Sequence, residues 1–502
     1  MEIGLRMKKE QVYVLILLAV LFGAAACLAL GLMADRRNES IESANVFMEE
    51  TPEITSGWVE ENGEWFYIND GTGEKASGWL EVEGEKYYLN PETKVRQKGL
   101  LKLSENEWYF FDEQGKMLTN CVAENYVLNE TGRVERLILS DEEKENRKQQ
   151  MQPIIDEISK KYGATGVSVA LIENGEVTDN WQYGWAVKNS VAMSADTKIR
   201  IASITKVILA MNGFKMAENG IVDIDESIGT YWGFPVANPN FPNDAITLRN
   251  IFSHTSSIAD IDSYKNIEGR LRGNGIFRNV KPSDPAGWSY CNYAFGVAGT
   301  TLEKAANKTI YQISQENFFE PMGIDASFAA GRLKNKELLA SLYYADGSLA
   351  RSRETMAGFV GNDTPGNNGA FMMGGLCISA QDLAKMISIL ANDGVYQGTR
   401  YLTEESINTM EAQYCPATLH EVEVVQCFPL KYLTDIYGEE NLYFHTGSSY
   451  GVYTLFSYNP DTKNGVVVLT TGASGTCDEY GIYAVCGEIS EVLYQEVKKL
   501  MM

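Results

Sequence analysis

A serine and a lysine three residues apart open an apolar segment near the middle of the chain. Ser203 and Lys206 begin residues 203–220, where apolar residues recur at helical spacing and Gly220 is placed to end the helix. Residues three apart share one face of a helix, so the lysine amine is expected beside the serine hydroxyl. A lysine whose charge is disfavoured can take a proton from that hydroxyl. A solvated Ser–Lys pair on an ordinary helix has the same spacing, so the motif alone leaves both interpretations open.

Two more short polar motifs follow this segment. Tyr290-Cys291-Asn292 lies in PAGWSYCNYAFGVAG, and His445-Thr446-Gly447 lies in LYFHTGSSYGVYTLFSYNP. The order Ser–Lys, Tyr–x–Asn, His–Thr–Gly resembles the serine β-lactamase and penicillin-binding-protein superfamily, and the tyrosine resembles its class C β-lactamase and DD-peptidase branch. Longer segments extend this resemblance over roughly residues 150–500, namely ITLRNIFSHTSSI (246–258), GIVDIDESIGTYW (220–232), residues 374–410, and the pair HTGSSYGVYTLFSYNP and GVVVLTTG.

The two ends of this region read as strands of one sheet. Two strands joined by an Asn-Gly turn are expected in the segment GVSVALIENGEVTDNWQYGWA. A second hairpin is expected from YTLFSYNP together with NGVVVLTTG. Helices are expected from Asp141 to about Lys161 and from about Tyr480 to Leu500. The predicted fold class for residues 140–502 is α/β. The resemblance implies a β-lactamase-like antiparallel sheet flanked by helices, plus an all-helical subdomain.

The resemblance also implies catalytic roles. Ser203 is expected to attack a carbonyl, with Lys206 and Tyr290 sharing the proton. A phenolic oxygen serves as a base only if nearby cations lower its pKa, which Lys206 and a protonated His445 would do. The backbone amides of Ser203 and Ser448 are the expected oxyanion donors.

Substrate-binding roles follow from the same resemblance. Asn292 is expected to bind the acyl-side amide, and a charged His445 with Thr446 and Gly447 the substrate carboxylate. Most β-lactamases have lysine where His445 stands, whereas some DD-peptidases have histidine. At pH 7 a histidine is only partly charged, which favours a peptidase or esterase over an efficient β-lactamase.

Three other features have structural interpretations. Gly447 to Gly451 match the G-x-S-x-G elbow of α/β-hydrolases, but a strand-like run follows and the chain has no histidine after His445. His254 is expected to be a structural hydrogen-bonding residue. Ser257 stands where the resembled superfamily usually has glycine, which predicts an altered loop there.

A repeat precedes this region. Gly57, Gly78, Gly99 and Asn120 are spaced 21 residues apart, and each unit has a short strand-like run, a polar turn and an aromatic run. Such hairpins cannot bury a core alone, so residues 56–135 are expected to stack as a β-hairpin solenoid.

These units resemble the cell-wall-binding repeats of choline-binding and glucan-binding surface proteins. In such repeats, aromatic rings of adjacent units form cages for a quaternary ammonium group. The resemblance makes cage candidates of five aromatic residues, Trp58, Trp65, Tyr67, Trp79 and Tyr88. The third and fourth units lack the tryptophan of the first two, with Leu100 and Cys121 in its place. The favoured interpretation is a stalk in which the aromatics stack repeat on repeat.

The N-terminal region predicts export. Residues 11–34 are almost wholly apolar, and at about 1.5 Å per residue they are long enough to cross a bilayer core. Arg6, Lys8 and Lys9 precede them, which favours a cytoplasmic tail of residues 1–10 and a transmembrane anchor, followed by a linker over residues 35–55. A cleaved signal peptide and lipidation at Cys27 are the alternatives. All three place the rest of the chain outside the cytoplasm.

Composition excludes several other functions. The net charge is −24, which argues against nucleic acid as a partner. The presence of three histidines and the lack of a CxxC motif argue against a zinc site, and no other metal or cofactor is expected. Seven of the eight cysteines follow the apolar segment. Cys415 with Cys427, and Cys477 with Cys486, are close enough in sequence to pair.

Together these features predict a membrane-anchored serine hydrolase that faces the cell wall and has a wall polymer, peptidoglycan or teichoic acid, as its partner. The candidate reactions are removal of a terminal D-alanine from peptidoglycan stems, hydrolysis of D-alanyl esters on teichoic acid, and β-lactam hydrolysis. The non-enzymatic alternative is a wall-binding or penicillin-sensing protein, which would have no need of Ser203, Lys206 and Tyr290 together.

Overall fold

The computed structural model describes residues 56–104, 107–273 and 275–499. They form two compact units, one of the described residues up to 80 with 89–96, the other of residues 81–88 and those from 97 onward. The predicted tail, anchor and linker (1–55), including Cys27, lie outside the described residues. Among the helices that are described, none is long and apolar enough to span a bilayer.

The repeat segment forms antiparallel hairpins, which confirms the interpretation of its period. Left-handed turn residues join the strands: Asn62 and Gly63 have φ of +52° and +84°, as a two-residue hairpin loop requires. The fourth unit adds a third strand and so forms a small sheet. The strands are β1 (Gly57–Glu61), β2 (Glu64–Ile68), β3 (Gly78–Val82), β4 (Glu85–Leu89), β5 (Gly99–Ser104), β6 (Glu107–Phe111), β7 (Cys121–Ala123), β8 (Tyr126–Leu128) and β9 (Val134–Leu137).

Two of the predicted cage aromatics already contact a cation of the same chain. The guanidinium carbon of Arg96 lies 5.0 Å from the ring centre of Trp58 and 5.2 Å from that of Trp65. Trp58 is opposite Tyr67 in the register of β1 and β2, and their rings meet edge to face at 5.2 Å. An internal arginine therefore occupies ring faces that a quaternary ammonium ligand would need.

Trp79 and Tyr88, the remaining candidates, lie in other surroundings. Trp79 is 43% exposed and lines a shallow pocket together with the side chains of Lys75 and Lys94. Tyr88 is half-buried on β4. Glu74 also lines this pocket, and among the described residues its lining holds the indole of Trp79 without a second aromatic ring, so it lacks the several rings of a quaternary ammonium cage.

The second unit contains a nine-stranded antiparallel sheet. Its order is β12-β11-β10-β26-β25-β24-β23-β22-β21, so the predicted N-terminal hairpin pairs with the last strand, with Gly166 opposite Thr471. The strands are β10 (Gly166–Glu173), β11 (Glu176–Val187), β12 (Val191–Ala192), β21 (Cys415–Leu419), β22 (Val422–Gln426), β23 (Lys431–Ile436), β24 (Glu439–Ser449), β25 (Val452–Asn459) and β26 (Asn464–Thr471). The predicted meeting of the terminal strands is confirmed.

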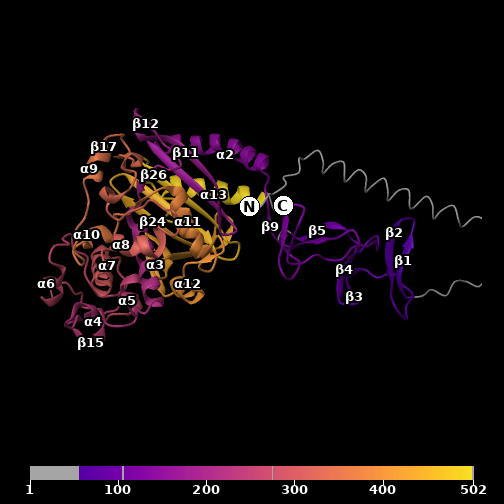
Figure 1. Ribbon diagram of the computed structural model, residues 1–502, viewed down its shortest axis with the longest axis horizontal. Helices are drawn as coiled ribbons and strands as arrows, with labels where there is room; N and C mark the ends of the chain where they lie inside the picture. The colour runs from indigo at the N-terminus through magenta and orange to yellow at the C-terminus, as the bar shows by residue number, and fades with distance from the viewer. Residues whose placement is uncertain (1–55, 105–106, 274, 500–502) are drawn as a thin grey trace, which may run out of the picture. The chain divides into compact units, whose positions relative to one another are not determined.

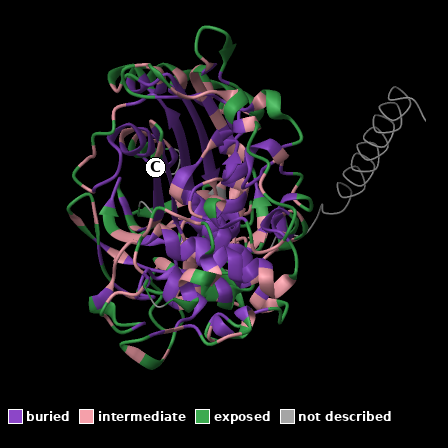
Figure 2. Ribbon diagram, turned by 90° about the vertical axis from the view of Figure 1, so that its left-hand side faces the viewer, coloured by how far each residue is buried: buried purple, intermediate pink, exposed green. Residues whose placement is uncertain are grey.

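Alternation along the strands gives the sheet two buried faces. On β10, Val169 and Leu171 belong to a core with helices α2 (Asp141–Lys161) and α13 (Ala484–Lys499). Ala170 and Ile172 belong to the other core, which includes α3 (Thr205–Glu218), α7 (Asn292–Ala306) and α11 (Ala380–Ala391). Figure 2 shows these buried strands and helices in purple, with exposed residues in the surrounding loops.

Apart from α2 and α13, the helices of this unit lie between β12 and β21 in the sequence (Figure 1). Its remaining helices are α4 (Gly229–Trp232), α5 (Leu248–Phe252), α6 (Ile267–Arg272), α8 (Ile310–Ser314), α9 (Arg353–Ala357), α10 (Gly369–Met372) and α12 (Glu404–Glu411). This α/β arrangement is the predicted β-lactamase-like fold. All seven described cysteines are free thiols, so neither pair considered from the sequence is bonded.

A buried ion network holds α2 against the sheet. Arg147 of α2 donates to Glu173 of β10 at 2.7 and 2.6 Å and to Asp179 of β11, and its side chain is 2% exposed.

Arg147→Met should lower the free energy of unfolding by about 3 kcal/mol or more, because two buried carboxylates lose their partner. Denaturant unfolding followed by circular dichroism measures this. Lys161→Met, in an exposed pair with Glu488, is the control and should leave the midpoint nearly unchanged; equal midpoints for both variants would contradict the prediction.

Candidate active site

The turn that carries Ser203 packs tightly against strand β24. Ser203 lies in a short 3₁₀ turn (Ala202–Ile204) that leads into α3, and Ala202 before it has φ of +48°. A Cβ added to Gly447 of β24 would come within 2.4 Å of the Ile201 carbonyl oxygen and 3.1 Å of the Ser203 amide nitrogen. Only glycine permits this approach. The next residue, Ser448, lines the same pocket as Ser203, so the two predicted oxyanion donors belong to one site.

Lys206 is the buried amine next to the Ser203 hydroxyl. Its Nζ lies 3.1 Å from Ser203 Oγ and donates to the Met373 carbonyl oxygen at 2.7 Å. The residue is fully buried, and burial lowers the pKa of Lys206 to about 7. A substantial fraction of Lys206 is therefore neutral at neutral pH and able to accept the hydroxyl proton.

Tyr290 contacts the same hydroxyl, but its pKa is not lowered toward that of a general base. It shares a hydrogen bond with Ser203, and Lys206 Nζ lies 5.0 Å from its ring centre. Burial nevertheless raises the pKa of Tyr290 above its ordinary value. The expectation that neighbouring cations lower this pKa is not met, since desolvation outweighs them. Tyr290 is thus a protonated phenol that can donate and relay a proton, while Lys206 has the pKa of a base.

His445 is buried in an uncharged state. Burial lowers the pKa of His445 well below its ordinary value, and the nearby Lys431 and Lys206 lower it further. Its Nδ1 lies 2.6 Å from the Thr446 carbonyl oxygen, so Nδ1 carries the proton and Nε2 faces the site as an acceptor. The charged histidine expected from the sequence is therefore replaced by a neutral one, because the His445 side chain is buried and lies near two lysines.

Lys431 is a functional candidate that sequence reasoning missed. It begins β23, is 2% exposed, and its Nζ donates to Gln426 Oε1 at 3.2 Å. Burial lowers the pKa of Lys431 to about 8, so it stays mostly charged at pH 7. It supplies the positive charge that His445 lacks. No local sequence signal marks it, since FPLKYLTDI reads as an ordinary strand.

The exposed Asp260 and the buried His254 position the Tyr–x–Asn motif. Asp260 accepts from Asn292 Nδ2 at 3.2 Å and from the backbone amide of Tyr293 at 2.8 Å. His254 Nδ1 accepts from the Cys291 amide at 3.0 Å, and its ring lies 4.4 Å from that of Tyr290. His254 thus has the structural role predicted for it, whereas Asp260 was not recognised from the sequence.

One pocket of about 330 Å³ collects these groups. It is lined by Ser203, Tyr290, Asn292, Thr418, Leu419, His420, Lys431, His445, Thr446, Ser448 and Tyr483. Lys206 lies behind this lining and contacts it through its hydrogen bond to Ser203 Oγ. Three distant segments of sequence therefore meet at one serine, as the motif order suggested.

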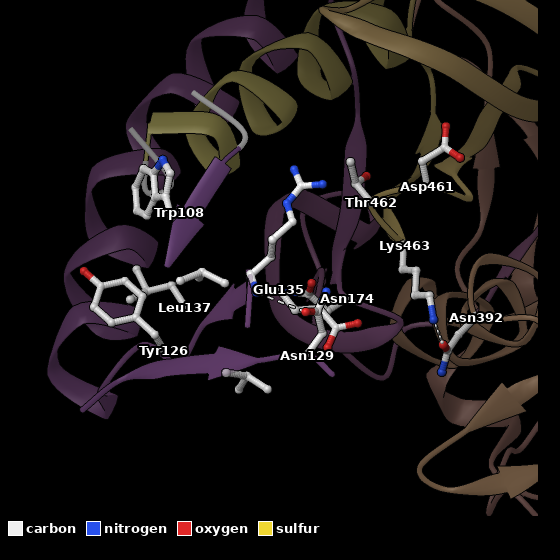
Figure 3. A pocket seen from close by; sticks show the side chains of 13 residues that line it. Trp108, Tyr126, Asn129, Glu135, Leu137, Asn174, Asn392, Asp461, Thr462 and Lys463 are labelled. Atoms are coloured by element: carbon white, nitrogen blue, oxygen red, sulfur yellow. Dashed lines mark hydrogen bonds between the residues drawn. The ribbon is translucent and has the colours of Figure 1, made fainter. Parts of the chain in front are cut away.

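A second cavity, of about 460 Å³, has a different character. Trp108 of β6 and Tyr126 of β8 line it together with Asn174, Asn392 and Lys463 from turns of the same unit, as Figure 3 shows. Lys463 donates to Asn392 Oδ1 at 2.8 Å. None of the predicted catalytic residues borders this cavity, so it is not the active site.

Comparison with known proteins agrees with the site and the repeats. The sequence profile of the Beta-lactamase family matches residues 151–485. The chain belongs to this family. It is a serine hydrolase of the β-lactamase and penicillin-binding-protein superfamily, which confirms the resemblance seen in the motifs. A profile described as a cell wall binding repeat matches residues 56–74 and 98–117.

Individual relatives are distant. Penicillin-binding protein 4* of Bacillus subtilis (strain 168) is 21% identical over 215 residues, covering 40% of this chain and 46% of that protein. Protein flp of Staphylococcus aureus (strain MRSA252) is 25% identical over 334 residues, covering 64% and 62%. The match therefore spans less than two thirds of either relative.

Solved structures share the fold. D-amino acid amidase from Ochrobactrum anthropi SV3, complexed with D-phenylalanine, superposes with a TM-score of 0.56 at 22% identity, covering 70% of this chain and 98% of the amidase. The octameric penicillin-binding protein homologue from Pyrococcus abyssi has a TM-score of 0.51 at 19% identity, covering 70% and 77%.

The two buried lysines predict a narrow bell-shaped pH profile. The fraction of neutral Lys206, the candidate base, grows as pH rises through about 7, and the fraction of charged Lys431, the candidate anion-binding group, falls as pH rises through about 8. Measured from about pH 5 to about pH 10, kcat/KM should rise and then fall with flanks near these values. Lys431→Met should remove the alkaline flank. A profile that is flat between about pH 6 and about pH 9 would refute this assignment.

Proposed function

We propose that the protein hydrolyses D-alanyl-D-alanine peptides through an acyl-enzyme on Ser203. Neutral Lys206 takes the hydroxyl proton as the oxygen attacks the carbonyl, and the amides of Ser203 and Ser448 stabilise the oxyanion. The C–N bond then breaks, and the proton reaches the leaving amine through the Tyr290 hydroxyl. Water, deprotonated by Lys206, releases the acyl group and restores the serine.

The other groups of the pocket orient the substrate in this proposal. Lys431 and the Thr446 hydroxyl bind the carboxylate of the departing D-alanine, while Gly447 lets this strand approach the Ser203 turn closely enough for the contact. Neutral His445 accepts a hydrogen bond from the substrate at its Nε2 atom. Asn292, fixed by Asp260, binds the acyl-side amide.

The observation that carries the proposal is the presence of two buried lysines around one serine, Lys206 with its Nζ 3.1 Å from the serine oxygen and Lys431 in the lining of the same pocket. One is poised to accept a proton and the other to hold an anion. A D-alanyl ester of a polyol has no carboxylate for Lys431, so this cation favours the carboxypeptidase over the esterase. A binding-only protein would not need an amine with a lowered pKa 3.1 Å from the serine oxygen. β-Lactams also carry a carboxylate, and β-lactamase activity is the second candidate.

The location in this proposal is the outer face of the cell membrane. Residues 11–34 would anchor the chain as a single-pass helix, and the repeats would hold the enzyme near the wall polymer as a spacer. Two observations support this proposed location: the apolar run of residues 11–34 and the match of two repeat units to a cell wall binding repeat.

Substrates that differ only at the carboxylate test the role of Lys431. We expect a D-Ala-D-Ala peptide to be cleaved with a kcat/KM at least about tenfold above that of its C-terminal amide, since a charged hydrogen bond contributes about 1.5–3 kcal/mol. Lys431→Met should bring this ratio close to one, and Lys431→Arg should keep part of it.

The controls separate this role from general damage. Lys463→Met, on a turn away from the pocket, should keep the wild-type ratio. Ser203→Ala should neither cleave the peptide nor become labelled by a fluorescent penicillin. A wild-type enzyme that prefers a D-alanyl ester or the amide to the free carboxylate would overturn the carboxypeptidase assignment.

The repeats are expected to act as a spacer and not as a choline receptor. Because Arg96 covers the rings of Trp58 and Trp65, the ectodomain should pass through a choline-substituted resin without delay. Trp58→Ala should elute at the same volume. Retention of the wild type that is lost in Trp58→Ala would show that the rings do bind choline.

A further inference from the structure

A cavity of about 310 Å³ borders the catalytic turn without sharing a residue with the catalytic pocket. Arg200 lines it three residues before Ser203, and Tyr450 lines it directly after the end of β24. Met373 lines it too, and the Met373 carbonyl oxygen accepts the hydrogen bond from Lys206 Nζ. The cavity therefore lies against the segment that leads into Ser203 and against the residue that Lys206 contacts, with a lining separate from that of the catalytic pocket.

Two arginines face this cavity around one aromatic ring. The guanidinium carbon of Arg351, at the end of β17 (Leu349–Arg351), lies 3.7 Å from the ring centre of Tyr450, and that of Arg200 lies 5.1 Å from it. Arg200 Nε also donates to the Gly374 carbonyl oxygen at 2.5 Å. The ring and this carbonyl hold both cations in place.

Neither cation has an acidic partner in the described part of the chain. No Asp or Glu oxygen there lies within 4.0 Å of a nitrogen of Arg200 or Arg351. The thiol of Cys377 also lines the cavity, but burial raises the pKa of Cys377 to about 12, so it is neutral. In a chain with a net charge of −24, two arginines without a carboxylate around one cavity mark a place for an anion.

The rest of the lining is apolar. Phe328 and Met356 are fully buried there, whereas Phe359 is 38% exposed and Tyr450 is 37% exposed. A volume of this size is at the lower end for small-molecule sites and fits one side chain, not a polymer. The matching ligand is a short aliphatic chain that ends in a carboxylate.

We propose that this cavity is an acyl-donor pocket for an aliphatic side chain ended by a carboxylate, held by Arg200 and Arg351. The inference rests on the proposed function, in which Lys431 and Thr446 already hold the leaving group. In this proposal the second pocket, lined by Arg200 just before the catalytic turn, receives the other side of the scissile bond. The enzyme thus selects acidic donors in addition to the terminal D-alanine.

Two donors that differ in one charge test the pocket. Glutaryl-D-Ala-D-Ala carries the carboxylate, and glutaramoyl-D-Ala-D-Ala replaces it by an uncharged amide of the same shape. We expect wild type to favour the glutaryl peptide in kcat/KM by at least about tenfold. Arg351→Met should bring this ratio close to one, and Arg351→Lys should retain part of it. Arg332→Met, whose guanidinium instead pairs with Asp363, should leave the ratio at the wild-type value.

The outcomes distinguish the pocket from the proposed function. Equal turnover of both peptides by wild type would overturn the pocket and leave the carboxypeptidase standing. Absence of turnover together with absence of penicillin labelling would refute the carboxypeptidase. In that case, calorimetry with Ser203→Ala still decides, because the pocket requires tighter binding of the glutaryl peptide, and equal affinities overturn it.

Discussion

The close contact between strand β24 and the turn at Ser203 is the constraint on which the active site depends. Gly447 allows the strand to reach the Ile201 carbonyl and the Ser203 amide, where any side chain would collide. The contact is fixed from the neighbouring strand, because Thr454 Oγ1 donates to the Ile201 carbonyl oxygen at 3.1 Å. Beside this contact, Lys206, Lys431 and His445 are buried, and the loss of solvation on burial sets the charge of each.

Desolvation assigns the roles in this site. It lowers the pKa of Lys206 to about 7 and that of Lys431 to about 8, raises that of Tyr290, and keeps His445 neutral. Nearby cations alone would have favoured an ionised tyrosine, so the burial of the phenol decides against it. The proton acceptor is then the amine, and the anion-binding charge comes from a different strand from the one that carries the third motif.

Much of the fold follows from local sequence. The helix from Asp141 to Lys161, the Asn-Gly hairpin at 174–175 and the repeat hairpins all have periodicity or turn residues that act within a few positions. The three motifs were likewise recognisable, because each is a short pattern. Asp260 and Lys431 were not, since their importance comes from contacts with residues more than 30 positions apart or on adjacent strands, which no local pattern encodes.

The sequence by itself determined the kind of chemistry available: a serine with a lysine one helical turn away, a tyrosine and a histidine in the order of one enzyme family, and a repeated aromatic hairpin. Only the tertiary structure decided which group is charged and which ring face is open. Burial placed the cation on Lys431 and not on His445, and packing placed Arg96 over Trp58. Charge state and ring access depend on the water and the neighbours around a group, and those are set by segments that meet only when the chain folds.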